Sequence, residues 1–380
     1  MNVNQIHRLH SLICITTLWL CMEPAFASLD SELIGWTDAK EDGVDLVQTH
    51  RALPRNCDLS IGEWVYDASY PLYDASCPYL STEYSCRRNG RPDSDYEKWR
   101  WKPHHCLIPR FNALDFLGRI RGKRVMLVGD SIMRNQWESL VCMVEAVIPI
   151  EMKLVSSDGP SMAFHALDFE ASIEFFWAPL LVELKEDAQN KRVLRLDSIE
   201  ENAKYWRDVD VLVFDSAHWW THTGKWSSWD YYSEGDSLFT DLNPIVAYEK
   251  GLTTWAQWVD LNLDPQRTRV IFRSLSARHN RDNGWQCYKK KEPMVFSGYT
   301  PRVPAQLVVL REVVKKMSFP VYLQEITSMS ELRRDGHPSV FRIPGDTQRR
   351  MESVTRTSDC SHWCLPGVPD SWNEMLFALL

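Results

Sequence analysis

The sequence lacks an excess of positive charge, internal repetition and glycosylation signals, and each absence narrows what the protein can be. Its 43 Lys and Arg residues are outnumbered by 51 Asp and Glu, for a net charge of −8. There is no basic footprint, so no nucleic-acid partner is expected. The chain has no repeat, heptad pattern or low-complexity tract, and no Asn-x-Ser/Thr sequon for N-glycosylation. The remaining composition, 44% hydrophobic and 25% charged over 380 residues, suffices for one large domain with an appendage.

Long hydrophobic runs are also absent, apart from an apolar stretch near the start. Residues 1–27 have the layout of a secretory signal peptide, with a mildly basic start, an apolar stretch over 9–21 and Ala-Phe-Ala at 25–27 as the cleavage site. This stretch is short for a membrane span, which needs about 20 residues; an uncleaved anchor is the alternative. Residues 28–55 are polar and acidic and are interpreted as a leader. No retention signal of the Lys-Asp-Glu-Leu type is present at the C-terminus.

The cysteines indicate an oxidising compartment. Two of the ten fall in the signal, and an even number in the remainder of a secreted chain predicts four disulfides of open connectivity. A zinc site is the alternative because Cys360, His362 and Cys364 cluster, but no second pair with ligand spacing accompanies them, and no metal is expected. Four cysteines lie within 56–107, where aliphatic residues are few, so this segment is predicted to be a small module held by disulfides. The eight are Cys57, Cys77, Cys86, Cys106, Cys142, Cys287, Cys360 and Cys364.

The stretch 123–136 has the layout of a nucleophile at a strand-to-helix junction. Four apolar residues, Val125–Val128, predict a buried strand, and the apolar residues after position 131 recur with helical spacing. Between these elements lie Gly129, Asp130 and Ser131. Gly129 would let the backbone turn sharply, and the unpaired N–H groups of the first helical turn would hold an oxyanion beside the Ser131 hydroxyl. The alternative is that Asp-Ser before a helix is an ordinary N-cap.

A serine nucleophile needs a base, and the C-terminal run from residue 359 to 373 offers one. Asp359 and His362 are three residues apart, a spacing that lets both side chains face one way on a turn or helical start. The carboxylate could then orient the imidazole, and the imidazole could take the proton of Ser131. The two halves lie 362 − 131 = 231 residues apart, so the fold must bring them together.

From Phe111 onward, apolar strands alternate with helical stretches, which predicts an α/β sandwich with a mainly parallel sheet. Two further segments, Ile173–Trp177 and Val193–Leu196, are strand-like and are interpreted as a hairpin or an insertion. The expected strands are Val125–Val128, Val209–Phe214, Arg269–Arg273 and Val321–Gln324, and the expected helices are Phe111–Leu117, Pro244–Leu261 and Pro304–Met317. Ligands collect at the carboxyl ends of such strands, where the sequence places Ser131 and the segments 215–220, 273–279 and 334–338.

These motifs together resemble the plant trichome birefringence-like family, and in particular its PMR5-like members. The resemblance rests on Gly129-Asp130-Ser131 with the Ile-Met-Arg-Asn-Gln that follows, and on the runs 359–367, 370–373 and 334–338. It extends from Cys57 to the end of the chain. It implies an SGNH-hydrolase-like three-layer sandwich over 108–380, preceded by a small disulfide-rich N-terminal module over 56–107.

The resemblance also implies an activity and a set of site residues. Family members O-acetylate cell-wall polysaccharides in the Golgi or secretory pathway, and some relatives are linked to removal of acetyl groups from pectin. By position Ser131 matches the nucleophile, His362 the general base and Asp359 its partner. An acetyl-serine would form and pass its acetyl group to a sugar hydroxyl. The implied disulfides are Cys57–Cys106, Cys77–Cys142, Cys86–Cys364 and Cys287–Cys360.

One departure from the family pattern concerns the oxyanion hole. Many members have an Asn after the mid-sheet strand, but this sequence has Asp215, and a carboxylate cannot donate a hydrogen bond unless protonated. The Ser131 N–H is therefore expected to be assisted by the side chain of Asn135 or Gln136, or by another backbone N–H. Asp215 is interpreted as a substrate ligand or a structural residue. The candidates for oxyanion or substrate contacts are Gly129, Asp130, Arg134, Asn135, Gln136, Asp215 and His218.

Three of the polar residues near the expected site have two interpretations each. His218, beside Trp219 and Trp220, either lines a sugar cleft or is a buried, hydrogen-bonded histidine. Arg134 either meets an anionic sugar such as galacturonate or pairs with a nearby carboxylate. His337, directly before a proline, is interpreted as a turn residue rather than a second base.

Three functions follow from these expectations. The favoured one is an O-acetyltransferase acting on a wall polysaccharide, with pectin preferred; the second is an acetylesterase of the same fold; the third is a pectin-binding protein without chemistry. No bound cofactor is expected, but an acetyl donor is required, either acetyl-CoA or another acetyl ester. We expect a monomer in the Golgi lumen or the extracellular wall, in contact with a membrane only if the N-terminal segment is an uncleaved anchor.

Overall fold

The computed structural model describes residues 57–222, 224, 227–281, 284–294, 303–345 and 358–380. The expected signal peptide at 1–27 and the leader at 28–55 lie outside these residues. Within the described ranges, no helix has both the length and the apolar character needed to cross a membrane.

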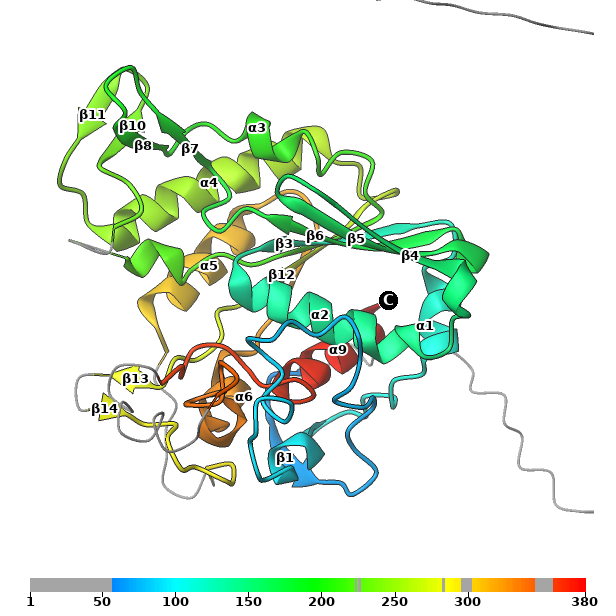
Figure 1. Ribbon diagram of the computed structural model, residues 1–380. Coiled ribbons are helices and arrows are strands. Elements are labelled where there is room, and N and C mark those ends of the chain that lie inside the picture. Colours follow the sequence, from blue (N-terminus) through cyan, green and yellow to red (C-terminus); the bar gives the residue numbers. More distant parts are fainter. Residues whose placement is uncertain (1–56, 223, 225–226, 282–283, 295–302, 346–357) are drawn as a thin grey trace, which may run out of the picture. The chain divides into compact units, whose positions relative to one another are not determined.

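A seven-stranded sheet lies at the centre of the fold, in the order β15-β12-β9-β3-β6-β5-β4 (Figure 1). The first five strands run parallel, and β5 and β4 add an antiparallel hairpin at one edge. The mainly parallel sheet is thus confirmed. The sequence pattern does not predict β4, because five of its six residues are exposed and show no alternation. The strands are β3 (Arg124–Gly129), β4 (Lys153–Asp158), β5 (Ser161–Ala166), β6 (Ala171–Trp177), β9 (Val211–Phe214), β12 (Arg269–Arg273) and β15 (Val321–Gln324).

Helices cover both faces of this sheet, which gives the expected three-layer sandwich (Figure 1). Successive residues of a strand point to opposite faces, so Val125 and Leu127 of β3 pack under α1, α2 and α9, whereas Met126 and Val128 pack under α3, α4 and α5. The helices are α1 (Ala113–Arg119), α2 (Ser131–Glu145), α3 (Glu200–Ala203), α4 (Pro244–Asn262), α5 (Ala305–Lys316), α6 (Thr327–Glu331) and α9 (Val368–Leu379).

The two strand-like segments, Ile173–Trp177 and Val193–Leu196, lie in different sheets of the structure. Ile173–Trp177 belongs to β6, a parallel neighbour of β3. Val193 and Leu194 lie in β8 of a separate four-stranded sheet, so the two segments do not form one hairpin. This second sheet has the order β11-β10-β8-β7, with β7 (Glu183–Glu186), β8 (Arg192–Arg195), β10 (Tyr231–Glu234) and β11 (Ser237–Phe239).

The segment 57–107 has little regular structure and is held by disulfides. Its strands β1 (Gly62–Tyr66) and β2 (Trp99–Pro103) form one antiparallel pair. The disulfides join Cys57 to Cys106, Cys77 to Cys142, Cys86 to Cys364 and Cys287 to Cys360, the pairings that the family resemblance implied. Because Cys360 and Cys364 are both oxidised, neither can offer a thiolate to zinc, and the zinc alternative is wrong. The remaining short elements are η1 (Asp95–Lys98), η2 (Ile150–Met152), η3 (Leu167–Phe169), η4 (Trp219–Thr221), β13 (Asn280–Arg281), β14 (Gly284–Trp285) and η6 (Arg334–Gly336).

The C-terminal motif at 370–373 fixes α9 against α2. Gln136 Nε2 donates to Asn373 Oδ1 over 3.0 Å, and Asn373 Nδ2 donates back to the Gln136 carbonyl over 3.1 Å. Asp370 accepts from Ser139 Oγ and from the backbone N–H of Gly367, over 2.7 and 2.9 Å. Burial raises the pKa of Asp370 to about 7. These polar contacts between two buried helix faces set the position of α9, which begins four residues after Cys364.

We predict that removing the Cys86–Cys364 disulfide loosens the segment that carries His362. The bond spans 278 residues of sequence, and replacing both cysteines by serine should lower the free energy of unfolding by about 2–5 kcal/mol. Amide hydrogen exchange over 359–365 should accelerate in this variant. In the matched control, Cys77→Ser with Cys142→Ser, stability should also fall while exchange over 359–365 stays slow. Equal exchange in the two variants would contradict the prediction.

Candidate active site

The nucleophile candidate stands at the first position of α2, directly after strand β3. The residue before it, Asp130, has extended backbone and caps the helix, with its carboxylate accepting from the Ile132 N–H over 2.8 Å. The N-cap of this helix is therefore Asp130, and the Ser131 hydroxyl remains free for other contacts. Ser131 is partly exposed.

Gly129 is needed for space and not for an unusual backbone conformation. Its φ is not in the left-handed region. A Cβ at this position would instead collide with Asp215 Oδ1 and press on the Met133 Cβ. The Asp215 carboxylate thus reaches the strand end only because residue 129 has no side chain.

The structure brings Ser131, His362 and Asp359 into one hydrogen-bonded line. His362 Nε2 lies 2.7 Å from Ser131 Oγ, and His362 Nδ1 lies 2.7 Å from Asp359 Oδ2. The second carboxylate oxygen accepts from the backbone N–H groups of Ser361 and His362, over 2.9 and 3.1 Å. An imidazole held in this way donates from Nδ1 and presents a lone pair at Nε2 to the hydroxyl, which is the arrangement of a serine nucleophile with its base.

The Asp359 carboxylate stays ionised in this setting. Burial by itself would raise its pKa, but the hydrogen bond and charge of His362, together with the two backbone N–H donors, lower the pKa well below the usual range. Arg342 adds a cation at 3.6 Å from Asp359 Oδ2. A permanently charged partner favours the positive charge that His362 acquires when it takes a proton.

The small N-terminal module contributes to this site directly. The ring of Tyr84 lies over the His362 imidazole, with centroids 5.6 Å apart, and its hydroxyl donates to the Ser131 carbonyl over 3.1 Å. The Leu365 N–H donates to the Tyr84 carbonyl over 2.9 Å, and Cys86 is bonded to Cys364. The sequence does not single out Tyr84, because it is one of many aromatics in a segment without periodicity.

The two side-chain amides expected at the oxyanion hole are used elsewhere. Asn135 donates to the Trp363 carbonyl over 3.1 Å and accepts from the Trp363 N–H over 2.8 Å. Gln136 is bonded to Asn373, as described above. Both residues are fully buried. They therefore position the base segment and α9, and the donor that remains at the nucleophile is the Ser131 N–H, which donates to no acceptor in the described part of the chain.

Asp215 is a structural residue. It is buried, one carboxylate oxygen is bonded to Arg273 Nη2, and the other accepts from the Asp130 N–H over 3.2 Å. Burial lowers the pKa of Arg273 to about 10, against the opposing charge of Asp130. The ion pair occupies the place where an oxyanion-hole amide was expected, and both oxygens of the Asp215 carboxylate have partners within the protein.

His218 is the buried, hydrogen-bonded histidine of the two interpretations above. Its Nε2 donates to the Ser276 carbonyl over 2.9 Å, and its Nδ1 lies 3.6 Å from Asp130 Oδ2. Burial alone would raise the pKa of Asp130, but His218, Arg273 and the Ile132 N–H lower it. Arg134 forms an ion pair with Glu138 over 3.0 Å, which is the second of its two interpretations, pairing with a nearby carboxylate.

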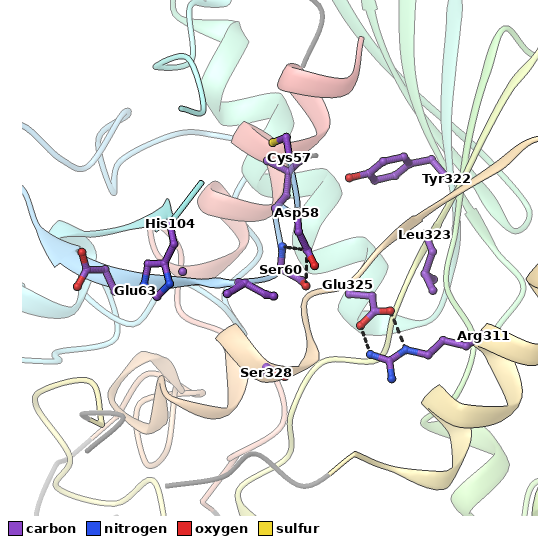
Figure 2. Close-up of a pocket in the computed structure, with 13 residues that line it drawn as sticks. Cys57, Asp58, Ser60, Glu63, His104, Arg311, Tyr322, Leu323, Glu325 and Ser328 are labelled. Atoms are coloured by element: carbon purple, nitrogen blue, oxygen red, sulfur yellow. Dashed lines mark hydrogen bonds and ion pairs between the residues drawn. The ribbon is translucent and has the colours of Figure 1, made fainter. Parts of the chain in front are cut away.

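A surface pocket of about 870 Å³ lies apart from these residues (Figure 2). Its lining includes neither Ser131, His362 nor Asp359. The pocket is formed between residues 57–63 of the module and the segment around β15, and its one arginine, Arg311, is taken up by two hydrogen bonds to Glu325, over 2.8 and 2.5 Å. We therefore assign no chemistry to it.

We predict that Ser131 reacts with a fluorophosphonate probe and that Asp359→Asn slows labelling about 10²–10⁴-fold, because the base loses its orienting anion. Labelling is followed by mass spectrometry of the peptide that contains Ser131. The exposed control Asp236→Asn should label at the wild-type rate, and labelling of Asp359→Asn at that rate would contradict the assignment.

The same substitution should change stability in a pH-dependent way. The lowered pKa means that the stabilisation by Asp359 is present above its ordinary value of about 4 and is lost as the pH falls below it. The unfolding free energies of wild type and Asp359→Asn, compared by urea denaturation, should therefore differ at pH 7 and converge under acid conditions.

Comparison with known proteins agrees with the fold and the site. The GDSL/SGNH-like acyl-esterase family found in Pmr5 and Cas1p matches residues 108–379, and the PMR5 N-terminal domain matches residues 55–107. Protein trichome birefringence-like 36 of Arabidopsis thaliana is 58% identical over 349 residues, which is 91% of this chain and 91% of the relative. Protein trichome birefringence-like 43 of the same plant is 43% identical over 335 residues, 85% of this chain and 88% of the relative. The chain therefore belongs to the GDSL/SGNH-like acyl-esterase family and, within it, to the trichome birefringence-like proteins.

Proposed function

We propose that this protein is an O-acetyltransferase that moves an acetyl group onto a hydroxyl of a plant cell-wall polysaccharide. The observation that carries the proposal is the hydrogen-bonded line from Asp359 through His362 to Ser131 at the start of α2. Membership of an acyl-esterase family supports an enzyme that transfers or hydrolyses acyl groups. The hydrogen bonds that join Asp359, His362 and Ser131 argue against a protein that only binds glycan.

The proposed reaction has two steps. In the first, Ser131 Oγ attacks the carbonyl of an acetyl donor while its proton passes to His362 Nε2; the tetrahedral oxyanion is held by the Ser131 N–H, and His362 then protonates the leaving group. In the second, a sugar hydroxyl gives its proton to His362 and attacks the acetyl-serine. Collapse of the second intermediate returns the proton to Ser131 Oγ and releases the acetylated sugar.

The second candidate is an acetylesterase, which the description of the matched family as acyl-esterases favours. Water would replace the sugar hydroxyl in the second step, with the same proton transfers. The two functions share Ser131, His362 and Asp359, so they differ in whether a glycan or water reaches the acetyl-serine.

Arg278 favours an anionic polysaccharide, and hence pectin, as the partner. Its Nη1 donates to the Thr221 hydroxyl over 3.2 Å, and in the described residues no carboxylate forms an ion pair with it. Burial lowers its pKa, and the charges of Asp359 and Asp130 oppose this, so the guanidinium lies within electrostatic range of one carboxylate of the triad and of the carboxylate next to Ser131. A uronate carboxylate is the kind of group that a guanidinium in this position binds.

Two partly exposed tryptophans favour a sugar polymer. Trp177 at the end of β6 is opposite Gly129 in the sheet register, and Trp219 packs edge-on against it with centroids 5.4 Å apart. His222 lies 5.3 Å from the Trp219 ring. Flat aromatic surfaces beside a nucleophile suit the C–H faces of sugar rings. Acetyl-CoA or another acetyl ester would supply the acetyl group.

Four disulfides fit a protein of the secretory pathway. We place the reaction in the Golgi lumen or the cell wall, where polysaccharide acceptors are available, and the protein would act there as a monomer.

We predict that the secreted protein transfers acetyl from an activated ester to oligogalacturonides and that Ser131→Ala abolishes the transfer. Products are followed by mass spectrometry with oligogalacturonide and xylan oligosaccharides as acceptors. A gain of one acetyl group on an oligosaccharide supports the transferase. Release of acetate from acetylated pectin without transfer to any glycan would move the assignment to the esterase.

Arg278→Gln should raise the KM for oligogalacturonides about 10–100-fold, because a charge-assisted hydrogen bond contributes about 1.5–3 kcal/mol. The KM for neutral xylan oligosaccharides should change far less. The matched control is Arg207→Gln, which removes a surface arginine paired with Glu200. Equal effects on charged and neutral acceptors would remove the support for pectin.

A further inference from the structure

Two histidines outside the triad, His279 and His337, are buried together next to the segment that carries the base. They are 3% and 1% exposed. His279 Nδ1 lies 2.6 Å from His337 Nε2, His279 Nε2 lies 2.9 Å from the Glu331 carbonyl oxygen, and His337 Nδ1 lies 2.6 Å from the His362 carbonyl oxygen. All four ring nitrogens are therefore engaged in hydrogen bonds, and one of these bonds ends on the backbone of the base.

The number of protons that these contacts need fixes the charge of the pair. A backbone carbonyl oxygen can only accept, so His279 Nε2 and His337 Nδ1 must each carry a hydrogen. The contact between the two rings needs one hydrogen more, because two lone pairs at 2.6 Å would repel each other. Two neutral imidazoles hold two N–H hydrogens between them, whereas the three contacts need three. The hydrogen-bonded pair therefore carries one net positive charge.

The lowered pKa of His337 favours His279 as the carrier of the third proton. Burial, followed by the charge of His279, lowers the pKa of His337 well below its usual range. The His337 ring is stacked on Trp363, with centroids 4.0 Å apart and planes 24° apart. His337 thus donates from Nδ1 to the His362 carbonyl and accepts at Nε2 from His279 Nδ1–H.

Charged groups face this pair from each neighbouring segment. Asp359, from the base segment, raises the pKa of His337 and is the negative charge that favours a cation here, while His362 acts in the opposite direction. Arg91 Nη1 donates to the His337 carbonyl over 3.1 Å. Arg333 and Asp335, on the segment before His337, form a fully buried ion pair.

Backbone hydrogen bonds near the pair hold the base segment in place on both sides of His362. Ser339 and Asp359 exchange two hydrogen bonds of 2.8 and 2.9 Å, the Cys364 N–H donates to the Gly336 carbonyl over 2.9 Å, and the His279 N–H donates to the Cys360 carbonyl over 2.9 Å. The hydrogen bond from His337 to the His362 carbonyl lies between these contacts and, unlike them, depends on the protonation of side chains.

We propose that His279 and His337 form a positioning pair for the base, in which the shared proton keeps His337 Nδ1–H on the His362 carbonyl and so holds the His362 ring between Asp359 and Ser131. This inference rests on the proposed function in one respect, since His362 must be the group that takes the Ser131 proton.

The pair makes the site sensitive to pH in a particular direction. When the pair loses its third proton at rising pH, two hydrogens remain for its three hydrogen-bonding contacts. One contact then becomes repulsive, and the hydrogen bond that positions His362 weakens. The reactivity of Ser131 should therefore fall at high pH as the pair loses its third proton, which gives the pH profile an alkaline limb.

The test is the pH dependence of fluorophosphonate labelling of Ser131, corrected for hydrolysis of the probe. In His337→Asn, an amide N–H takes the place of Nδ1–H, but no second nitrogen is present to contact His279. In His279→Gln, the side-chain amide can still donate to the Glu331 carbonyl. Both variants should label near neutral pH and lose the alkaline limb. His337→Ala should label about 10-fold more slowly throughout, because it also loses the hydrogen bond to His362. The exposed control His105→Gln should keep the wild-type profile.

A second measurement detects directly which ring nitrogens of His279 and His337 are protonated. In ¹⁵N-histidine NMR of the wild-type protein, three of the four nitrogens of the pair should be protonated at the pH of fastest labelling, with coupling across the N–H···N bond. Only two protonated nitrogens, or an alkaline limb that survives in both His279→Gln and His337→Asn, would overturn the proposal. Because labelling needs no glycan, a protein that labels as expected but neither transfers nor releases acetyl would refute the proposed function and leave the pair intact.

Discussion

The two hydrogen bonds between the Asn135 side chain and the Trp363 backbone are the constraint on which the site depends. Asn135 lies one helical turn after Ser131, and Trp363 directly follows His362, so a single buried amide joins the two halves of the candidate site, which are 231 residues apart in sequence. An amide can satisfy a backbone N–H and a backbone carbonyl at once. Loss of this amide would leave both groups buried and unpaired, which is costly.

The base segment 358–364 has no helix or regular strand of its own, which explains why so many other contacts converge on it. Cys360 and Cys364 bond it to two distant parts of the chain. Tyr84 covers the imidazole from the small module, and Ser339 pairs with Asp359 in a two-residue bridge. The module is therefore part of the candidate active site, and its disulfides replace the hydrophobic core that a segment of its size cannot build.

A connected group of buried polar side chains lies at the carboxyl edge of the sheet. Asp130, Asp215, Arg273 and His218 lie within one connected group below the nucleophile. A buried ion pair contributes little net stability when complete but is costly to break, so Asp215 and Arg273 are expected to persist together. Because the ionised Asp215 cannot donate, the donors available to an anion beside Ser131 are backbone N–H groups at the start of α2, where the helix dipole also favours negative charge.

Much of this organisation follows from the sequence alone. The buried run at 125–128 and its neighbours are continuous apolar stretches with clear ends, so local patterning decides a parallel sheet with Ser131 at its carboxyl edge. The spacing of Asp359 and His362 likewise decides that one carboxylate can orient one imidazole. The roles of Asn135, Gln136, Asp215 and His337 could not be decided in this way, because a side-chain amide, carboxylate or imidazole takes its role from its partners. Those partners, among them Trp363, Asn373 and Arg273, come from remote parts of the chain. Only the tertiary structure brings them within hydrogen-bonding distance, and burial then makes each contact obligatory.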